Sequence, residues 1–439
     1  MKNFYASAST FALLIAFSAL SPAQSDVSKN STETSRGPSL EISGETNVLF
    51  YSFNQGKKEA NNGKGQGSHI SVEDSRLNFR FSGRADVLGG LEYTGFIGIT
   101  GNTEAGKTSV EENWIMLRNG HGRLIVGGHR GVADRMATGA FSVMGSTGGF
   151  DGNYKNVVNV STGVNRSTDM VGIQKDSNKV TFVLPRYYGL QAGVSFTPHG
   201  EQQGEAKLRT ISSRSSGINP YDKNNVELGV NYKTDLQGLG VKTSLTVLTG
   251  QSQPIRRRGT SPVNSEGRRF SETLYSGERS NSLSYALGLL LTYGNFEAGF
   301  EFIDNGESQV LKAIKDRDAG QMYTVAAGYT FGANKIALGY QFSERKLGTR
   351  IEHFGQTDIV AADNPKAKAK VISLTYDHKL AKGLSVFAEA NYFDFKTDDR
   401  WVQAQEKART SGATGASSIS EGVGNNHGHV FMLGTKVRF

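Results

Sequence analysis

The sequence RLNFRFSGRADVLGGLEYTGFIG, residues 76–98, predicts two β-strands joined by a tight turn. Apolar and polar side chains alternate along its first half, where Leu77, Phe79 and Phe81 alternate with Arg76, Asn78, Arg80 and Ser82. A period of two places the two kinds of side chain on opposite faces of a strand. The LGG sequence at 88–90 interrupts this pattern, and paired glycines favour a turn. The stretch therefore predicts a hairpin with one apolar face and one polar face.

The same alternation recurs along most of the chain, and the connections alternate between short and long. GN at 294–295 is a short connection, and residues 131–177 form a long one. Counting the runs between connections predicts 16 strands. They are expected at residues 39–53, 73–87, 91–101, 109–118, 123–130, 178–185, 190–198, 224–233, 239–250, 281–293, 296–304, 321–331, 335–343, 368–380, 384–396 and 428–439.

The length of these strands favours a membrane barrel over a soluble β-sandwich. Many have 9–13 residues, whereas about 5–6 residues is usual in soluble sheets and about 9–11 tilted residues cross a bilayer. Aromatic residues such as Tyr232, Tyr293 and Phe342 lie near strand ends, where interfacial girdles form. An even number of strands closes without a free edge. We therefore predict an all-β fold, a transmembrane up-and-down antiparallel β-barrel of 16 strands with short periplasmic turns and long extracellular loops.

Residues 1–23 have the pattern of a secretory signal peptide. Lys2 provides a positive start, FALLIAFSAL at 11–20 an apolar segment, and SPA at 21–23 a small-residue cleavage site. Residues 24–38 are rich in Ser, Thr and Asn, and we expect a mobile tail there. The barrel domain is then expected to cover residues 39–439.

The composition excludes several classes of function. The chain has no cysteine, which removes thiolate catalysis and disulfides. Its net charge of +8 is spread over scattered residues rather than a stripe, so we predict no nucleic-acid partner. No G-x-S-x-G or H-E-x-x-H sequence is present, and we expect no enzymatic activity.

Over about residues 40–439 the chain resembles the Gram-negative outer-membrane general porins, particularly alphaproteobacterial ones. The resemblance rests on residues 76–98, on RLIVGGHRG (123–131) and NKVTFVLPRYYGLQAGVSFTP (178–198), and on the terminal strand HVFMLGTKVRF (429–439). It implies a homotrimer of barrels in the cell outer membrane, surrounded by lipid and lipopolysaccharide, that passes small hydrophilic solutes and ions by passive diffusion. It also implies that Phe439 is recognised by the barrel-assembly machinery. It implies no cofactor.

The inward face of such a barrel is its functional surface. Arg76, Arg80 and Arg84 recur every four residues on the polar face of one strand, and Lys436 lies on a polar face near the C-terminus. A lipid-facing Arg or Lys costs about 2–4 kcal/mol at the midplane, so we expect these side chains to line the lumen. They either form part of the narrowest zone or are solvated wall residues.

The third long connection, residues 131–177, is the candidate constriction loop. The porin resemblance implies that it folds into the barrel and narrows it, and GSTGGFDGN at 145–153 is rich in glycine. Asp134 and Asp151 would then face the arginines across the opening and create a transverse field. The loop lacks the PEFGG-type sequence of enterobacterial porins, so no constriction residue is transferred by alignment. The alternative is an outer surface loop with solvated carboxylates.

Three other features have a weaker claim to function. GNTEAGKT at 101–108 matches the phosphate-binding loop pattern, but the strand before it alternates instead of being continuously apolar, so we predict a hairpin loop and no nucleotide binding. Arginines at 256–258 and 268–269 suit lipopolysaccharide phosphates, although solvation of such a run is the commoner outcome. His427 and His429 have no acidic or Cys partner nearby, and we predict no metal site.

The predicted function is a water-filled channel of the outer membrane. A substrate-selective channel and a surface receptor or adhesin barrel remain as alternatives, because they differ from a general channel only in the lining and the loops.

Overall fold

Sixteen strands form the wall of the protein, as the sequence predicts. They are β1 (Ser39–Gln55), β2 (Gln66–Ala85), β3 (Leu91–Asn102), β4 (Lys107–Asn119), β5 (Gly122–Gly128), β6 (Asn178–Val183), β7 (Leu190–His199), β8 (Asp222–Leu236), β9 (Leu239–Ser252), β12 (Ser282–Tyr293), β13 (Phe296–Asp304), β15 (Gln321–Phe331), β16 (Asn334–His353), β18 (Lys366–Ala381), β19 (Leu384–Lys396) and β20 (Asn426–Arg438).

The computed structural model describes residues 38–56, 65–88, 90–102, 107–161, 163–200, 222–257, 275–353, 356–359, 363–398 and 425–439. These belong to one compact unit, Gly37–Phe439. The predicted signal peptide and all but the last residue of the predicted tail lie outside the described residues.

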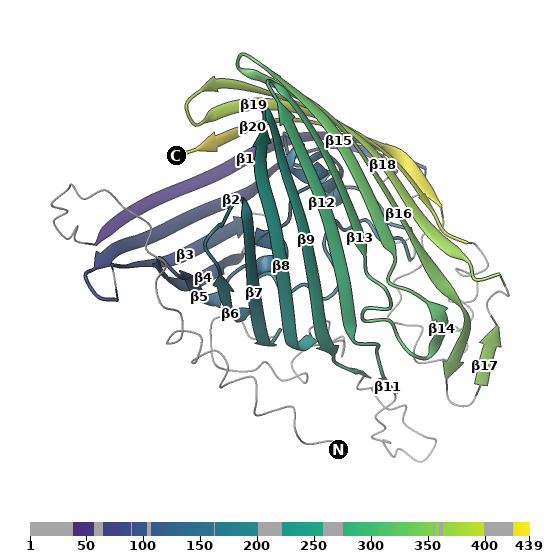
Figure 1. Ribbon diagram of the computed structural model, residues 1–439. Coiled ribbons are helices and arrows are strands. Elements are labelled where there is room, and N and C mark those ends of the chain that lie inside the picture. Colours follow the sequence, from purple (N-terminus) through teal and green to yellow (C-terminus); the bar gives the residue numbers. More distant parts are fainter. Residues whose placement is uncertain are drawn as a thin grey trace, which may run out of the picture. The chain divides into compact units, whose positions relative to one another are not determined.

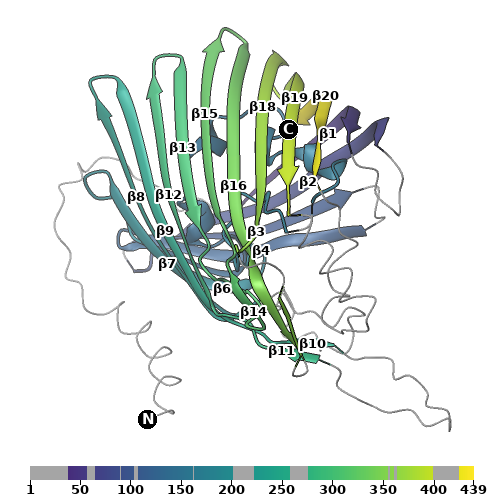
Figure 2. The same ribbon diagram turned by 90° about the vertical axis from the view of Figure 1, so that its right-hand side faces the viewer.

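The wall closes on itself. Each barrel strand pairs antiparallel with the strands before and after it, and β1 pairs with both β2 and β20. Glu45, for example, lies opposite Arg76 of β2 on one side and Arg438 of β20 on the other. Short turns join β8 to β9, β12 to β13 and β15 to β16 at the same end of the barrel (Figures 1 and 2). The predicted closed, antiparallel barrel of 16 strands is therefore confirmed.

Further short elements belong to the long connections. The strands β10 (Ile255–Arg257) and β11 (Tyr275–Gly277) pair with each other, while β14 (Ile314–Arg317) and β17 (Gln356–Ile359) pair with β16. The helical elements α2 (Val132–Arg135), η1 (Ala140–Ser142), η2 (Gly149–Asp151) and η3 (Asn153–Asn156) all lie in the third long connection. Among the described residues, no helix is long and apolar enough to cross a bilayer.

Several strands extend further than their alternation predicts. β2 begins at Gln66 instead of residue 73, and β16 continues to His353 instead of residue 343. The pairing of β1 with β2 continues to Asn54 opposite Gln66. Backbone pairing needs no apolar face once a strand leaves the membrane, so hydrophobic alternation does not mark these ends.

The outer and inner faces of the wall differ as expected over most of the barrel. Leu338, Leu374 and Leu433 point outward and are about half exposed. Thr324 and Gln341 point inward and are buried. An apolar outer band with a polar interior is the arrangement that lipid outside and water inside require.

One part of the inner wall is apolar, which the alternation of apolar and polar faces along most of the chain does not predict. Val371, Phe393, Phe395, Val430 and Met432 are all buried and point inward from β18, β19 and β20. They pack against Val143, Met144, Phe150, Tyr154 and Val158 of the third long connection. This cluster is larger than the other hydrophobic clusters of the described residues, and it confirms that the third loop folds inward.

Candidate functional site

The candidate site is the barrel interior together with residues 131–177, here called the constriction loop. Its coils lie within the ring of strands in Figure 1. The loop and the wall approach each other so closely that one glycine of each has no room for a side chain. A Cβ added at Gly145 of the loop would lie 1.9 Å from Oδ2 of Asp377. A Cβ added at Gly288 of the wall would lie 1.7 Å from the carbonyl oxygen of Thr138. The loop backbone therefore lies directly on the wall.

Carboxylates of the wall hold the loop through its backbone N–H groups. Glu227 Oε2 accepts from the backbone N–H of Ala133 at 3.0 Å, and Asp377 Oδ2 from that of Ser146 at 2.8 Å. Glu389 Oε2 accepts from both the backbone N–H and the hydroxyl of Thr147, at 2.9 and 2.8 Å. Hydrogen bonds to charged acceptors are about twice as strong as neutral ones. These carboxylates fix the path of the loop rather than facing solutes.

The far end of the same segment is held by β2. Glu73 Oε2 accepts from the side-chain amides of Asn153 and Asn156 at 2.8 and 2.9 Å, and also from the hydroxyl of Tyr51 at 2.7 Å. Loop and wall are thus joined from β8 round to β2.

The predicted arginines all belong to β2 but have different surroundings. Arg80 lies 5.8 Å from the centre of the Phe96 ring, and its Nε is 3.7 Å from Oε2 of Glu41. Arg84 reaches the periplasmic turn, since a Cβ added at Gly90 would lie 2.8 Å from its Nη2. Arg76 is connected to the constriction loop through Glu112, as described next.

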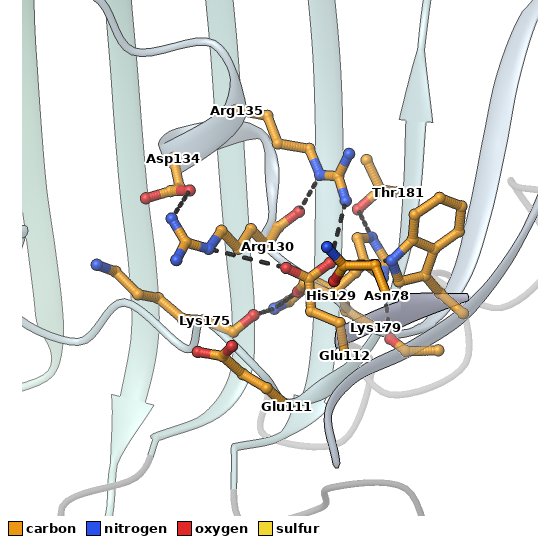
Figure 3. A network of polar contacts seen from close by, with 12 residues as sticks. Asn78, Glu111, Glu112, His129, Arg130, Asp134, Arg135, Lys175, Lys179 and Thr181 are labelled. Atoms are coloured by element: carbon orange, nitrogen blue, oxygen red, sulfur yellow. Dashed lines mark hydrogen bonds and ion pairs between the residues drawn. The ribbon is translucent and has the colours of Figure 1, made fainter. Parts of the chain in front are cut away.

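Glu112 of β4 connects the arginine side of the wall to the constriction loop (Figure 3). Its Oε1 accepts from Arg76 Nη2 at 3.1 Å, and its Oε2 accepts from the indole N–H of Trp114 at 2.9 Å. The guanidinium groups of Arg130, which immediately precedes the loop, and of Arg135 within it each come within 3.9 Å of this carboxylate. Three guanidinium groups therefore converge on one carboxylate between the wall and the constriction loop.

Charges at the start and end of the loop are stabilised by their neighbours. Burial acts to lower the pKa of Arg130, but Asp134 and Glu112 outweigh it and hold the pKa above its ordinary value. Burial likewise opposes the charge of Lys175, but Asp169 at 2.7 Å keeps the pKa of its ammonium raised. Both side chains therefore remain cationic across the physiological range.

The two predicted aspartates line the same cavity of about 310 Å³, which is partly open and lies between the loop and the wall. Asp134 pairs with Arg130 at 3.4 Å and so joins the network of Glu112 and Arg76. Asp151 lies at the end of η2 and pairs with Lys155 on the same loop. The structure thus brings Asp134 and Arg76 into one network, while Asp151 lies elsewhere along the cavity.

Lys436 holds the loop rather than standing alone in the lumen. Its ammonium donates to the carbonyl oxygen of Ser146 at 2.9 Å and lies 5.7 Å from the centre of the Phe387 ring. Its contacts place it beside the segment of the loop that Asp377 and Glu389 hold.

The structure describes the three weaker candidates, namely the GNTEAGKT sequence, the loop arginines and a metal site, only in part. Gly101 lies opposite Thr108 and Asn102 opposite Lys107 across the β3–β4 hairpin, so the GNTEAGKT sequence joins two antiparallel strands instead of a strand and a helix. Its central residues, 103–106, lie outside the described part. The arginines at 258, 268 and 269 also lie outside it. In the described part of the chain, no three His, Cys, Asp or Glu side chains are grouped so as to hold a metal ion.

The sequence analysis missed two sets of residues. The first is the set of loop-holding carboxylates, of which Glu227 and Glu389 are recognisable as inward acids but Glu73 and Asp377 are not. The second is Glu112 with Arg130 and Arg135, whose proximity depends on the fold of the loop. One sequence pattern marks the covered wall, because β19 and β20 carry apolar side chains on both faces, such as Tyr392 beside Phe393 and Val430 beside Phe431.

Comparison with known proteins identifies a family and a group of relatives. A family model described as "Gram-negative porin" matches residues 8–398. An uncharacterized protein of Rickettsia prowazekii is 23% identical over 383 residues, which are 77% of this chain and 78% of the relative. An uncharacterized protein of Rickettsia felis is 24% identical over 290 residues, 60% of this chain and 57% of the relative. The chain therefore spans little more than half of that second relative.

Solved structures with a similar fold are outer-membrane proteins. The trimer form of OmpT, an outer membrane protein of Vibrio cholerae, superposes with a TM-score of 0.52 at 11% identity, covering 92% of this chain and 100% of that one. An anion-selective porin from Comamonas acidovorans superposes with a TM-score of 0.51 at 14% identity, with the same coverage. At these identities the similarity extends to the fold alone.

Proposed function

This chain belongs to the Gram-negative porin family, and from that premise we propose that it forms a water-filled channel through which small hydrophilic solutes and ions diffuse passively across the outer membrane. The observation that carries the proposal is the closed barrel of 16 strands with the constriction loop folded against its inner wall. A barrel of this size leaves an aqueous channel.

We propose that the lining gives the channel a preference for anions. Wall carboxylates Glu227, Glu301 and Glu389 are at most 3% exposed, because the constriction loop covers them. On the uncovered wall, Glu41 and Glu92 are matched by Arg80 and Arg118 at 3.7 and 3.6 Å. Covering acids while leaving arginines in contact with water makes the accessible surface more basic, and rows of like charge select ions.

We propose that the channel is a homotrimer. Strands β5 and β6 have only 7 and 6 residues, which is about 20–24 Å along the strand and about 16–18 Å along the barrel axis. The apolar band of such barrels is about 25 Å tall. A second copy packed against this short wall would remove the mismatch. That OmpT of Vibrio cholerae has a trimer form is compatible with this proposal.

We also propose that the chain acts without catalysis, is exported by residues 1–23 and is recognised for assembly through Phe439. His129, Thr181 and Ser195 do form a row, with 2.8 Å from His129 Nε2 to Thr181 Oγ1 and 2.7 Å from there to Ser195 Oγ. All three are at most 1% exposed, under the constriction loop, and the hydroxyl of Ser195 accepts the backbone N–H of Val132. A substrate has no route to them, so the row is structural.

Swelling of proteoliposomes in iso-osmotic sugar solutions tests the passive-diffusion proposal. We expect uptake of uncharged sugars that falls steeply as their size increases, with little dependence on their stereochemistry. Uptake of one sugar and exclusion of others of equal size would replace the proposal with a substrate-selective channel. Vesicles as impermeable as protein-free ones would contradict both.

A further inference from the structure

Five lysines point outward from the extracellular ends of three neighbouring strands. Lys366, Lys368 and Lys370 of β18 share the outer face with exposed Ile372, Leu374 and Tyr376, while the alternate residues Ala367, Ala369 and Val371 are buried inside. Lys346 of β16 lies opposite Lys366, and Lys396 of β19 lies opposite Lys368. We call Lys346, Lys366, Lys368, Lys370 and Lys396 the lysine patch.

The carboxylates around the patch do not balance its charge. Glu344 lies between Lys366 and Lys368, with its two oxygens 2.5 and 3.1 Å from their ammonium groups. Asp394 is 3.4 Å from the ammonium of Lys396, and Asp318 accepts the backbone N–H of Lys346. Glu344 and Asp394 thus form ion pairs with three of the five ammonium groups, while Lys346 and Lys370 form none within the described part of the chain, so the patch retains positive charge on the outside of the barrel.

The height of the patch can be measured from Leu380, an exposed outward residue of β18 beside the short periplasmic turn. Lys370, Lys368 and Lys366 lie ten, twelve and fourteen residues further up β18. At ~3.4 Å per residue and a tilt of ~40°, these residues lie about 26, 31 and 36 Å above Leu380 along the barrel axis. An apolar band of about 25 Å therefore ends at the patch, and long lysine side chains extend upward to the headgroup level.

The patch also stays in contact with lipid if the short wall joins subunits. Going round the closed sheet, seven strands separate β18 from β6 on one side and six separate it from β5 on the other. β16, β18 and β19 lie together on one side of the barrel (Figure 2). The patch is thus nearly opposite β5 and β6.

We propose that the lysine patch binds the phosphate groups of an anionic glycolipid in the outer leaflet, such as lipid A. This inference rests on the outer-membrane location proposed above. Ammonium groups at the headgroup level are strongly attracted to anionic lipid, and phosphate is the anion that such a leaflet offers at this height. Soluble partners would instead meet the long extracellular connections between the strands.

Matched double variants of the full-length protein test the proposal. Lys346→Gln with Lys370→Gln removes two patch charges that have no ion pair in the described part of the chain. Lys379→Gln with Lys382→Gln removes two charges near the periplasmic turn that joins β18 to β19. Binding of lipid A, of chemically dephosphorylated lipid A and of inorganic phosphate is measured for each by native mass spectrometry and calorimetry in detergent, together with ion conductance in planar bilayers.

Each lysine near a charged leaflet contributes about a fivefold change in affinity, so the patch variant should bind lipid A on the order of 25-fold more weakly. The periplasmic variant should bind it as the wild type does, and inorganic phosphate should compete only at high concentration. Equal binding of phosphorylated and dephosphorylated lipid A, or equal losses in the two variants, would overturn the proposal. Conductance separates the two hypotheses, because a conducting protein with no patch effect refutes the lipid site alone, whereas lipid A binding without conductance refutes the channel alone.

Discussion

Removing charge from two wall carboxylates should release the middle of the constriction loop. Asp377→Asn combined with Glu389→Gln preserves the shape of both side chains. It replaces hydrogen bonds to a charged acceptor with hydrogen bonds to a neutral one. These carboxylates hold Ser146 and Thr147, which lie between the helical turns η1 and η2. No strand pairing of the barrel depends on either side chain, so the barrel itself should remain folded.

The magnitude follows from the bonds that change. Asp377 accepts the backbone N–H of Ser146 at 2.8 Å, and Glu389 accepts the backbone N–H and hydroxyl of Thr147 at 2.9 and 2.8 Å. A bond to a charged group contributes about 1.5–3 kcal/mol and a neutral one about 0.5–1.5, so each loses about 1 kcal/mol. Three such losses weaken docking by about 3 kcal/mol, which is on the order of 100-fold in local opening.

Hydrogen–deuterium exchange measured by mass spectrometry reports this opening at the amides of Ser146 and Thr147. Glu297→Gln is the matched control, because Glu297 is an inward carboxylate of β13 that pairs with Lys335 at 2.6 Å and forms no ion pair with the described residues of the loop. We expect faster exchange of residues 145–150 and noisier, larger single-channel currents in the double variant only. Exchange as slow as in the control would show that these carboxylates do not hold the loop.

Three further changes have defined outcomes. Neutralising Arg76, Arg80 and Arg84 to Gln should shift the reversal potential in a salt gradient toward cations, by about two- to threefold in permeability ratio per arginine. Gly145→Val should displace the loop and increase current noise, because its Cβ would lie 1.9 Å from Oδ2 of Asp377. Phe439→Ala should lower the yield of assembled barrel, measured as heat-modifiable protein in outer-membrane fractions.

The opposite results would be equally informative. An unchanged reversal potential would remove the arginines from the ion path. Quiet currents from Gly145→Val would mean that the loop tolerates a side chain at this contact. Normal assembly of Phe439→Ala would mean that the aromatic ring is not needed for recognition. The contribution of residue 439 would then be its backbone pairing with Gly44, in which each N–H donates to the other residue's carbonyl oxygen at 3.1 Å.

The barrel was predictable because the pattern that specifies each strand lies within a few consecutive residues. Alternation such as Leu77, Phe79 and Phe81 against Arg76, Asn78 and Arg80 follows from a strand between lipid and water, and each hairpin repeats it. The strand ends beyond the membrane, such as residues 344–353 of β16, were not predictable, because water on both faces imposes no pattern.

The interior was predictable only in part, since it depends on contacts between residues far apart in the chain. The four-residue spacing gives the arginines of β2 one face, but nothing local shows that Glu112 lies between Arg76 and the two arginines at the start of the loop, Arg130 just before it and Arg135 within it. Likewise, Asp377 is a wall residue whose partner, Ser146, is 231 positions away. Only the two-sided apolar character of β19 and β20 indicates from sequence that something covers the wall.

Ion conductance of the purified protein in a planar lipid bilayer tests the channel most directly. A trimer of barrels, each with its own lumen, should insert as events of three equal current steps, with a reversal potential displaced toward anions in a salt gradient. Folded protein that inserts into the bilayer and carries no current at any applied voltage would contradict the account.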